Sequence, residues 1–490
     1  MHPFLLISIL LGYFAVLMLV SWITSRGANN EAFFIGNHKS PWYLVAFGMI
    51  GTSISGVTFV SVPGFVHDAG FSYMQMILGN FVGYILIATV LMPMYYKLKL
   101  TSIYTYLDVR FGKSSYKTGA VFFLISRTIG SAVRLFLAAS VLQLALFDAW
   151  HVPFVVTVFV TIAFIWVYTY KGGIKTIIWT DSLQTLFFLI AVAITVYVIA
   201  SQMHLNLHGL IKTVSTSEYS KIFYFDNFLG NKLHFVKQFL AGILICVSMT
   251  GLDQDLMQKN LSCKNIKDAQ KNMLVFSIIM VFVNFMFLCL GVFLYLFAQN
   301  KGITLPLNAA GKIATDQVYP FIATGGYLPI LASVVFLLGL IASTCASSDS
   351  ALTALTTSYV FDILGRNKAD EDQLKRTRQR VHLGFSVLLL ITVLLFKLLN
   401  DKSIIDALFT IAAYTYGPLL GMFAFGFLTK HQVYDKAIPY IAIASPFVSF
   451  AISSSSKALF GYAFGYEILV VNALLTMLGM YLFRKNTVTN

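Results

Sequence analysis

The segment Gly51-Thr52-Ser53-Ile54-Ser55-Gly56-Val57-Thr58 lies within an apolar stretch, residues 42–67, that is long enough to cross a membrane. Its two glycines and four hydroxyl residues would let a helix unwind and expose carbonyl oxygens. Unwound backbone is tolerated inside a membrane only where protein or a cavity satisfies its polar groups. The segment therefore predicts a broken membrane helix whose break borders a cavity.

A similar but weaker pattern, Ser248-Met249-Thr250-Gly251, follows one five-helix unit later. Transporters often contain two inverted repeats whose first helices are broken near the bilayer midplane. The spacing predicts repeats at residues 42–203 and 234–429, one helix before them at 3–25 and two after them at 437–483. Glycine and serine would also permit close helix packing without a break, but the corresponding positions of the two segments favour paired breaks.

The composition is that of a membrane protein. Hydrophobic residues make up 58% of the 490 residues and charged residues 11%. We expect an all-α polytopic membrane protein with about thirteen transmembrane helices, forming one transmembrane domain over residues 1–490. The candidate spans lie near residues 3–25, 42–67, 71–96, 118–147, 153–170, 177–203, 234–252, 272–299, 327–364, 381–398, 403–429, 437–455 and 464–483.

The net charge of +14 is explained by the loops between these spans. Lys and Arg concentrate in alternate loops, which the positive-inside rule places in the cytoplasm. This orientation puts the N-terminus outside and the C-terminus inside, and no nucleic-acid partner is needed to explain the charge. The first span lacks a basic n-region and a clear cleavage site, so we expect a retained helix rather than a signal peptide.

Metal and redox enzymes are disfavoured. The four cysteines form no close motif, so neither a disulfide nor a zinc site is expected. The nine histidines lie in loops or at span ends. We see no catalytic cluster, and we expect no organic cofactor.

A second polar segment, Ser343-Thr344-Cys345-Ala346-Ser347-Ser348-Asp349-Ser350, lies inside another long apolar span. Polar and ionisable groups at membrane depth are costly, and by default they mark an ion or solute path. Hydroxyl, carbonyl and carboxylate oxygens are the ligands that hard cations prefer. This segment predicts a sodium-binding region.

Several short motifs occur in a fixed order over about 400 residues. They are Glu31-Ala32-Phe33-Phe34-Ile35-Gly36, Thr101-Ser102-Ile103-Tyr104-Thr105-Tyr106-Leu107 with Arg110-Phe111-Gly112, Tyr170-Lys171-Gly172-Gly173 with Trp179-Thr180-Asp181, Gln258-Lys259-Asn260-Leu261-Ser262, and Tyr416-Gly417-Pro418-Leu419-Leu420-Gly421. In these motifs the chain resembles the sodium/solute symporter family, which includes sodium-coupled sugar, proline, iodide and sialic acid transporters. The resemblance implies a five-plus-five inverted-repeat fold with broken first and sixth core helices. It also implies sodium symport by alternating access in a plasma membrane, here the bacterial inner membrane.

The resemblance implies a sodium site between the first and eighth core helices. Its carbonyl ligands would come from Gly51, Ile54 and Ser343, and its two hydroxyl positions fall on Ala346 and Ser347. Ala346 has no side-chain oxygen. A one-residue slip would restore two serines, but gaps inside a packed helix are disfavoured.

Some family members bind a second sodium ion, and the matching positions are Asp181, Asp349 and Ser350. Asp349 replaces a hydroxyl with a carboxylate. That carboxylate could strengthen the site, bring a proton into the cycle, or form a salt bridge with an intramembrane arginine.

Arg127 and Arg134 give the clearest indication of the substrate. They lie seven residues apart in one span and therefore share roughly one helix face. Guanidinium groups match carboxylate or phosphate in bidentate geometry. In the sialic-acid branch that the chain resembles, an arginine on this helix contacts the substrate carboxylate; the aligned position is near Gly130, so the match is regional. Arg134 is the preferred anchor, and the alternative is pairing with Asp181, Asp349 or a lipid headgroup.

Other polar and aromatic residues could complete a solute site, although an aromatic residue in such a position is more often ordinary packing. The candidates are Ser53, Ser55, Thr58, Gln75 and Asn80 as hydrogen-bonding groups and Tyr414 as a gating or stacking ring. The Glu and Gln that the sugar branch uses are absent from the corresponding stretches. The sequence thus favours a small anionic organic solute, such as sialic acid or another sugar acid.

Other functions remain open at this point. The chain could carry a neutral sugar or an amino acid with sodium, or serve as a membrane solute sensor or a channel. The expected partners are the solute, sodium and the lipid bilayer, and the sequence does not indicate an oligomeric state.

Overall fold

The computed structural model describes residues 3–485, apart from 27, 28, 99, 101, 171, 309, 366–369 and 400–402. Thr101 and Lys171 of the motifs above lie outside the described residues. Within them the chain forms helices and no β-strand. Each predicted span contains a helix or a pair of helices, so the all-α membrane fold is confirmed.

The span helices follow the predicted order. They are α1 (Pro3–Thr24), α3 (Trp42–Ser53) with α4 (Gly56–Ala69), α5 (Tyr73–Leu86) with α6 (Met92–Lys97), α8 (Lys113–Leu142), α9 (Phe154–Thr169), α10 (Gly173–Gln202), α12 (Phe235–Cys246) with α13 (Gln254–Leu261), α14 (Ile266–Asn300), α16 (Ile330–Ser358), α17 (Glu371–Leu399), α18 (Ile404–Thr415) with α19 (Gly417–Leu428), α20 (Ile438–Phe460) and α21 (Ile468–Leu482). Shorter connecting helices are α2 (Asn30–Ile35), α7 (Thr105–Arg110), α11 (Leu207–Thr216) and α15 (Thr315–Thr324).

By length and composition, eight described helices can cross a membrane alone, and up to eleven spans result if each bent pair counts as one. The remaining two predicted spans, α9 and α21, are shorter apolar helices. Several helices begin before the predicted apolar boundary, because hydropathy finds the hydrocarbon-spanning part of a helix and not its polar ends.

Both predicted breaks are present. α3 and α4 meet at 59°, and the α12 segment (Phe235–Gly251, which ends in a π-helical turn) meets α13 at 63°. A third bend of 44° separates α18 from α19. Pro418, in the first turn of α19, marks this bend, which the sequence analysis did not predict.

The first break owes its form to extended backbone and two close approaches. Ile54 and Ser55 leave the helical region, with ψ of 87° and 175°. A Cβ on Gly51 would lie 2.5 Å from the Thr185 hydroxyl of α10, and one on Gly56 would lie 2.5 Å from the Thr344 hydroxyl of α16. Only glycine lets the two ends of the break pack this closely against α10 and α16.

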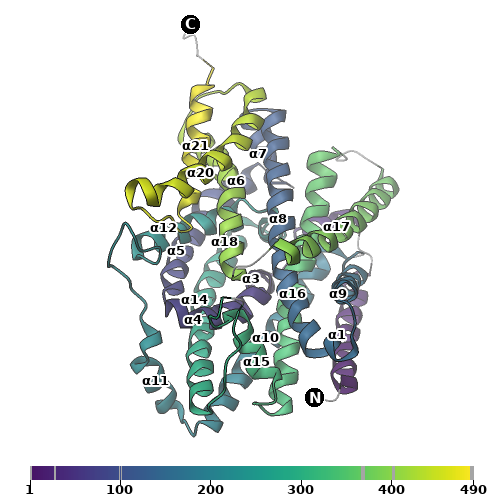
Figure 1. The fold of residues 1–490 in the computed structure, drawn as a ribbon. Coiled ribbons are helices and arrows are strands. Elements are labelled where there is room, and N and C mark those ends of the chain that lie inside the picture. The colour runs from purple at the N-terminus through teal and green to yellow at the C-terminus, as the bar shows by residue number, and fades with distance from the viewer. Residues whose placement is uncertain are drawn as a thin grey trace.

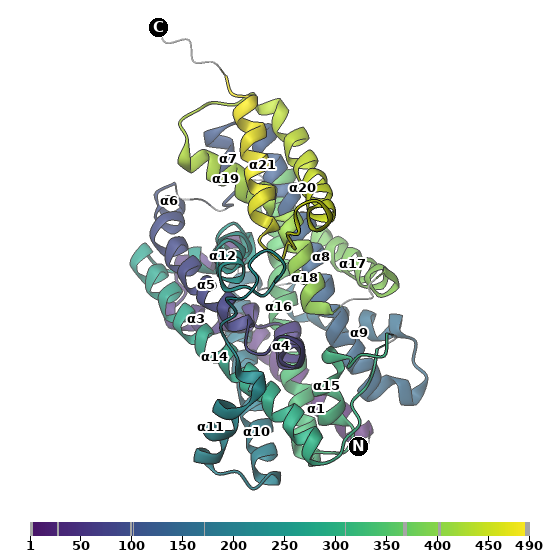
Figure 2. The same ribbon diagram turned by 60° about the vertical axis from the view of Figure 1, so that its left-hand side comes forward.

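The helices form an elongated bundle (Figures 1 and 2). α10 and α16 pack extensively against each other, and α3 contacts both. The N-terminus of α1 and the loop helix α11 lie at one end of the bundle, and the C-terminus lies at the other. Opposite ends for the two termini are what an odd number of spans requires; which end faces the cytoplasm remains a prediction from the charged loops.

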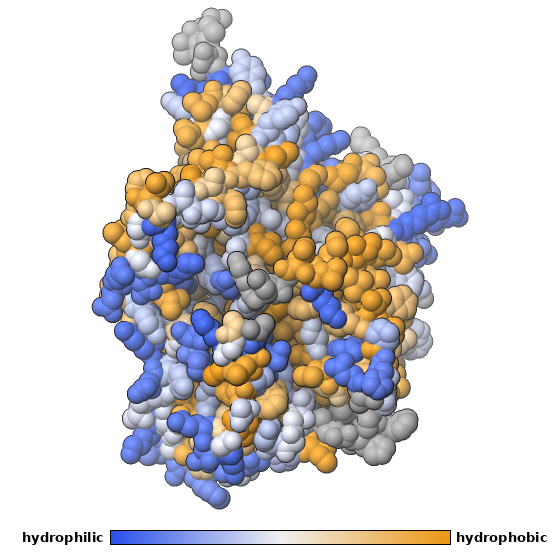
Figure 3. Space-filling model, viewed as in Figure 1, coloured by the Kyte–Doolittle hydropathy of each residue, from blue (hydrophilic) through white to orange (hydrophobic). Residues whose placement is uncertain are grey.

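Apolar side chains cover much of one face (Figure 3). They gather over α17 and α20, where Leu383, Leu395, Phe447 and Phe450 are among the exposed large hydrophobic residues. Hydrophilic side chains gather at the end that carries α11. This distribution is typical of a protein whose sides contact lipid.

Candidate functional site

The α3–α4 break lies directly against the hydroxyl-rich part of α16. A Cβ on Gly51 would be 3.4 Å from the Ala346 Cβ and 3.1 Å from the Asp181 carbonyl oxygen. The last carbonyls of a helix have no intrahelical partners, and α3 ends at Ser53, two residues beyond Gly51. The structure therefore brings the predicted backbone donors of α3 next to the predicted hydroxyl positions of α16.

Ser343 and Ser347 of α16 lie near the break and are buried, and their hydroxyls bond to backbone carbonyls. Ser343 donates to the Leu340 carbonyl at 2.9 Å, and Ser347 donates to the Thr344 carbonyl at 3.0 Å. A hydroxyl that donates its proton keeps lone pairs with which it can bind a cation. Ser347 can thus serve as a cation ligand without losing its backbone bond, whereas Ala346 contributes no side-chain oxygen.

These oxygens suit a sodium ion. We expect Ser347→Ala to raise the sodium concentration for half-maximal uptake about fivefold, because losing one ligand of roughly 1 kcal/mol changes affinity by that factor. Ala346→Ser should lower the same concentration by adding the missing oxygen. Sodium titration of uptake in proteoliposomes measures both.

Ser277→Ala is a matched control for the loss of a buried serine. Ser277 is fully buried and donates to the Leu274 carbonyl at 2.7 Å, a bond of the same type on α14. The Ser277→Ala variant should leave the sodium dependence of uptake unchanged. Equal sodium dependence in the Ser347 and Ser277 variants would remove Ser347 from the site.

The three residues predicted to hold a second ion have separate partners. Tyr168 of α9 donates to Asp349 at 2.8 Å, and Ser350 donates to Asp255. Asp181 accepts from Thr52 at 2.9 Å and from the ammonium of Lys259. One of the three alternatives for Asp349, a salt bridge with an arginine, is absent among the described residues.

Lys259 was not among the predicted site residues. It belongs to α13, is fully buried, and forms an ion pair with Asp181 and a hydrogen bond with Thr52. The sequence did contain a signal for this residue, because Lys259 belongs to the motif that begins at Gln258. A lysine so close to a predicted break needs a buried acidic partner, and Asp181 is that partner.

Next to the break, the structure encloses a cavity of about 90 Å³. Six predicted substrate residues line it: Ser53, Ser55, Thr58, Asn80, Arg127 and Arg134. The cavity is smaller than the roughly 300–1,000 Å³ of common ligand sites. Its walls must therefore move apart to admit most organic solutes.

Two predicted substrate residues lie elsewhere. The Gln75 side chain donates to the Leu233 carbonyl at 2.9 Å and accepts from the Tyr224 amide at 3.1 Å. The Gln75 amide thus stabilises the loop after α11 and is not directed at the cavity. Tyr414 lines a separate, larger cavity.

Arg127 is held by two carboxylates at the second break. It pairs with Asp255, and its other terminal nitrogen lies 3.8 Å from Asp253. Asp253 also caps α13 through the Asp255 amide and accepts the Tyr416 hydroxyl at 2.5 Å. The predicted alternative of a paired arginine therefore holds for Arg127, although with partners that the sequence analysis did not name.

Arg134 has no such partner. Within the described part of the chain it forms no ion pair, its Nε has no hydrogen-bond partner, and its residue is 8% exposed. It lies two turns from Arg127 and lines the same cavity. Arg134 is thus the guanidinium available to an anion in this cavity.

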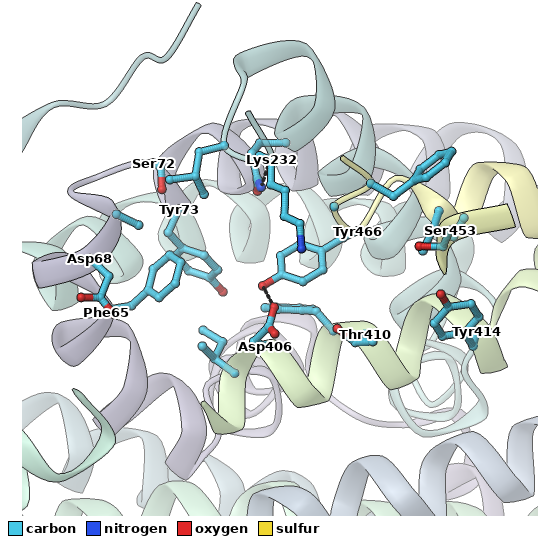
Figure 4. Close-up of a pocket in the computed structure, with 18 of the residues that line it drawn as sticks. Phe65, Asp68, Ser72, Tyr73, Lys232, Asp406, Thr410, Tyr414, Ser453 and Tyr466 are labelled. Atoms are coloured by element: carbon cyan, nitrogen blue, oxygen red, sulfur yellow. Dashed lines mark hydrogen bonds between the residues drawn. The ribbon is translucent and has the colours of Figure 1, made fainter. Parts of the chain in front are cut away.

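A larger cavity of about 430 Å³ lies beyond the first (Figure 4). Lys232, Asp406 and Tyr466 border it, and Tyr466 donates to Asp406 at 3.1 Å. Tyr73 and Phe409 line both cavities, with ring centroids 6.3 Å apart. These two rings therefore border both the larger cavity, here called the outer cavity, and the smaller inner one.

The chain matches known proteins over most of its length. The profile of the sodium:solute symporter family matches residues 33–435. The sodium/iodide cotransporter of Homo sapiens is 25% identical over 435 residues, which are 85% of this chain and 65% of that protein. The sodium/sialic acid symporter SiaT of Proteus mirabilis is 23% identical over 447 residues, 89% of this chain and 87% of that one.

Among solved structures, a Na⁺-coupled sialic acid symporter in a substrate-bound outward-open state matches with a TM-score of 0.82. The match covers 97% of both chains at 19% identity. At this identity the likeness supports the fold, and the solute must be argued from the site itself.

Proposed function

Because the chain belongs to the sodium:solute symporter family, we propose that it imports a small organic anion together with sodium. The observation that carries the proposal is Arg134, a buried guanidinium that lines the inner cavity without a carboxylate partner among the described residues. An unpaired charge at membrane depth costs at least about 2.5–3.5 kcal/mol. Asp253 and Asp255 act on Arg134 electrostatically, but their direct contacts are with Arg127. A solute carboxylate would give Arg134 a direct partner.

The hydroxyls and the amide around the cavity suit a polar solute. Ser53 has a buried hydroxyl without a hydrogen-bond partner, and Asn80 also lines the cavity. Buried polar groups normally find partners. A sugar acid such as sialic acid would offer both a carboxylate and hydroxyls, and is our first candidate.

The relatives support an anion as well. Two of them are named for iodide and for sialic acid, which share a negative charge. A neutral sugar or an amino acid is the alternative solute, and it would leave Arg134 without a counter-charge from the solute.

Alternating access would use the two cavities in turn. Solute would enter the outer cavity, pass Tyr73 and Phe409, and meet Arg134 in the inner one. The ion pair of Arg127 with Asp255 links α8 to α13, and we propose that it helps to close the cytoplasmic side. We place the carrier in a plasma membrane, the inner membrane in a bacterium, with the N-terminus outside.

Competition between matched analogues tests the proposal. In proteoliposomes with an inward sodium gradient, a carboxylic acid should inhibit uptake about 10-fold or more better than its amide. Hydrogen bonds to charged groups are worth about 1.5–3 kcal/mol, and each 1.4 kcal/mol is a factor of ten.

Replacing sodium with potassium should abolish saturable uptake, which separates a carrier from a channel or a sensor. Equal inhibition by acid and amide would instead favour a neutral solute and give Arg134 a structural role.

A further inference from the structure

An open groove of about 590 Å³ lies between α1, α3 and α10. Its apolar lining includes Val20 of α1, Phe47 of α3, and Leu183 and Leu186 of α10. Among the described residues it shares none with the inner and outer cavities. The groove is therefore separate from the proposed path of the solute, and its walls suit an acyl chain.

The groove lies near the end of the bundle that the charged loops predict to be cytoplasmic. α1 ends at Thr24, α3 begins at Trp42 and α10 begins at Gly173, and the groove uses the neighbouring turns of these helices. Two rings that line it, Tyr43 and Trp179, are 58% and 48% exposed. Tyrosine and tryptophan are enriched at the membrane–water interface. The groove thus extends from the headgroup level towards the hydrocarbon core.

Hydrogen bonds between the three helices hold the groove in shape. Ser182 of α10 lines the groove and donates to the Leu44 carbonyl of α3 at 3.1 Å. The hydroxyls of Thr24 and Thr176 lie 2.9 Å apart and join the end of α1 to the start of α10. Because the groove is already formed, a ligand would need to order little of the protein.

Two basic residues lie at the headgroup end of the groove. Lys175 of α10 is one helical turn before Trp179, and its ammonium donates to the Arg26 carbonyl at 3.4 Å. The guanidinium carbon of Arg26 lies 3.5 Å from the centroid of the Trp22 ring. Neither cation forms an ion pair within the described part of the chain. Both charges are therefore available to an anion.

Lys271 of α14 adds a third positive charge at this end. Its ammonium lies 4.2 Å from the centroid of the Trp42 ring, which lies 6.0 Å from the ring of Tyr43. Of the acidic residues in these parts of the sequence, Asp268 bonds within the start of α14, and Glu31 lines a different cavity. The groove thus combines an apolar wall with a positively charged end.

We propose that this groove binds one anionic phospholipid, with its phosphate near Arg26, Lys175 and Lys271 and an acyl chain along Phe47 and Leu186. Basic pockets between membrane spans bind anionic headgroups, and a guanidinium can bind two phosphate oxygens at once. A phosphate without acyl chains would leave the apolar wall unfilled. The bound lipid would join α1, α3 and α10, and α3 leads into the first break.

Trp179 provides a local probe of the groove. The purified full-length protein is reconstituted in brominated phosphatidylcholine, whose chains quench a tryptophan that they contact. Quenching of Trp179 is the difference between wild type and Trp179→Phe. Unbrominated phosphatidylglycerol should relieve this quenching about 25-fold more effectively than unbrominated phosphatidylcholine, because Arg26 and Lys175 should each contribute a factor of about five.

Removing the two charges isolates their contribution. Arg26→Gln and Lys175→Gln should each lower the preference for phosphatidylglycerol about fivefold, and the double variant should lose nearly all of it. Lys430→Gln combined with Lys436→Gln is the matched control. These two exposed lysines lie between α19 and α20, at the same predicted side of the membrane but outside the groove. The control should keep the preference of the wild type.

Equal relief of quenching by the two lipids in the wild type would overturn the proposal. So would a double variant that keeps the preference of the wild type. A Trp179 that brominated lipid does not quench would show that no acyl chain occupies the groove. The measurement needs neither sodium nor solute, so an error in the proposed function leaves its result unchanged.

Discussion

Arg134→Ala should weaken the uptake of a carboxylate solute about 30-fold or more, measured as the rise in the solute concentration for half-maximal uptake. Removing one partner of a buried charge pair costs about 2–5 kcal/mol, and every 1.4 kcal/mol is a factor of ten. Arg134 lines the cavity without a protein carboxylate to hold it among the described residues. The folded protein should therefore survive the change while the solute loses its anchor.

Arg134→Lys separates charge from geometry. Lysine keeps the positive charge but lacks the planar fork that binds a carboxylate with two parallel hydrogen bonds, so its effect should lie between wild type and alanine. The amide analogue, which carries no charge, should respond little to either substitution. An amide that loses as much affinity as the acid would show that Arg134 shapes the cavity and does not bind the anion.

Arg127→Met should destabilise the folded protein by about 3–5 kcal/mol, because it leaves a buried charge without its partner. Arg127 is the ion-pair partner of Asp255 and lies near Asp253, and both carboxylates are fully buried. Thermal unfolding of the detergent-purified protein should show a clearly lower midpoint. Combining Arg127→Met with Asp255→Asn should recover part of the loss, because one of the stranded charges is then removed.

Lys113→Met is the matched control for removing a cation. Lys113 pairs with Asp108 at 2.6 Å on the surface, with 78% of its side chain exposed. Exposed ion pairs contribute about 0–1 kcal/mol to stability. The midpoint of thermal unfolding of Lys113→Met should therefore barely change. A stable Arg127→Met protein with weak acid uptake would mean that Arg127 binds the solute and is not primarily a structural partner.

The fold was largely predictable from the sequence, because membrane spans and their breaks leave local signals. Apolar length gave the spans, and glycine with hydroxyl residues gave the breaks near Ile54 and Gly251. The family resemblance and the interpretation as a transporter, not an enzyme, are confirmed by the match over residues 33–435. The bend before Gly417 was missed because a single proline at a helix start does not require one.

The sequence predicted which regions of the chain form the site, but not which side chains pair with one another. The sequence contains no distance between helices, so it could not show that Arg127 pairs with Asp255, or that Arg134 forms no ion pair among the described residues. Gln75 was assigned to the solute because polar residues in a span are usually functional, yet its side chain forms its hydrogen bonds with the loop after α11. The roles proposed for the sodium-site residues remain predictions.

The ion pair of Lys259 with Asp181 has a consequence for the driving force. A charge that stays in the protein throughout the cycle is not carried across the membrane. One sodium ion moving with one monovalent acid would transfer no net charge, and the membrane potential would then contribute nothing to accumulation. A tenfold sodium gradient, worth about 1.4 kcal/mol, would concentrate the acid about tenfold at any voltage. A second sodium ion would add about 2.3 kcal/mol per 100 mV, so the voltage dependence of accumulation would report how many sodium ions accompany the acid.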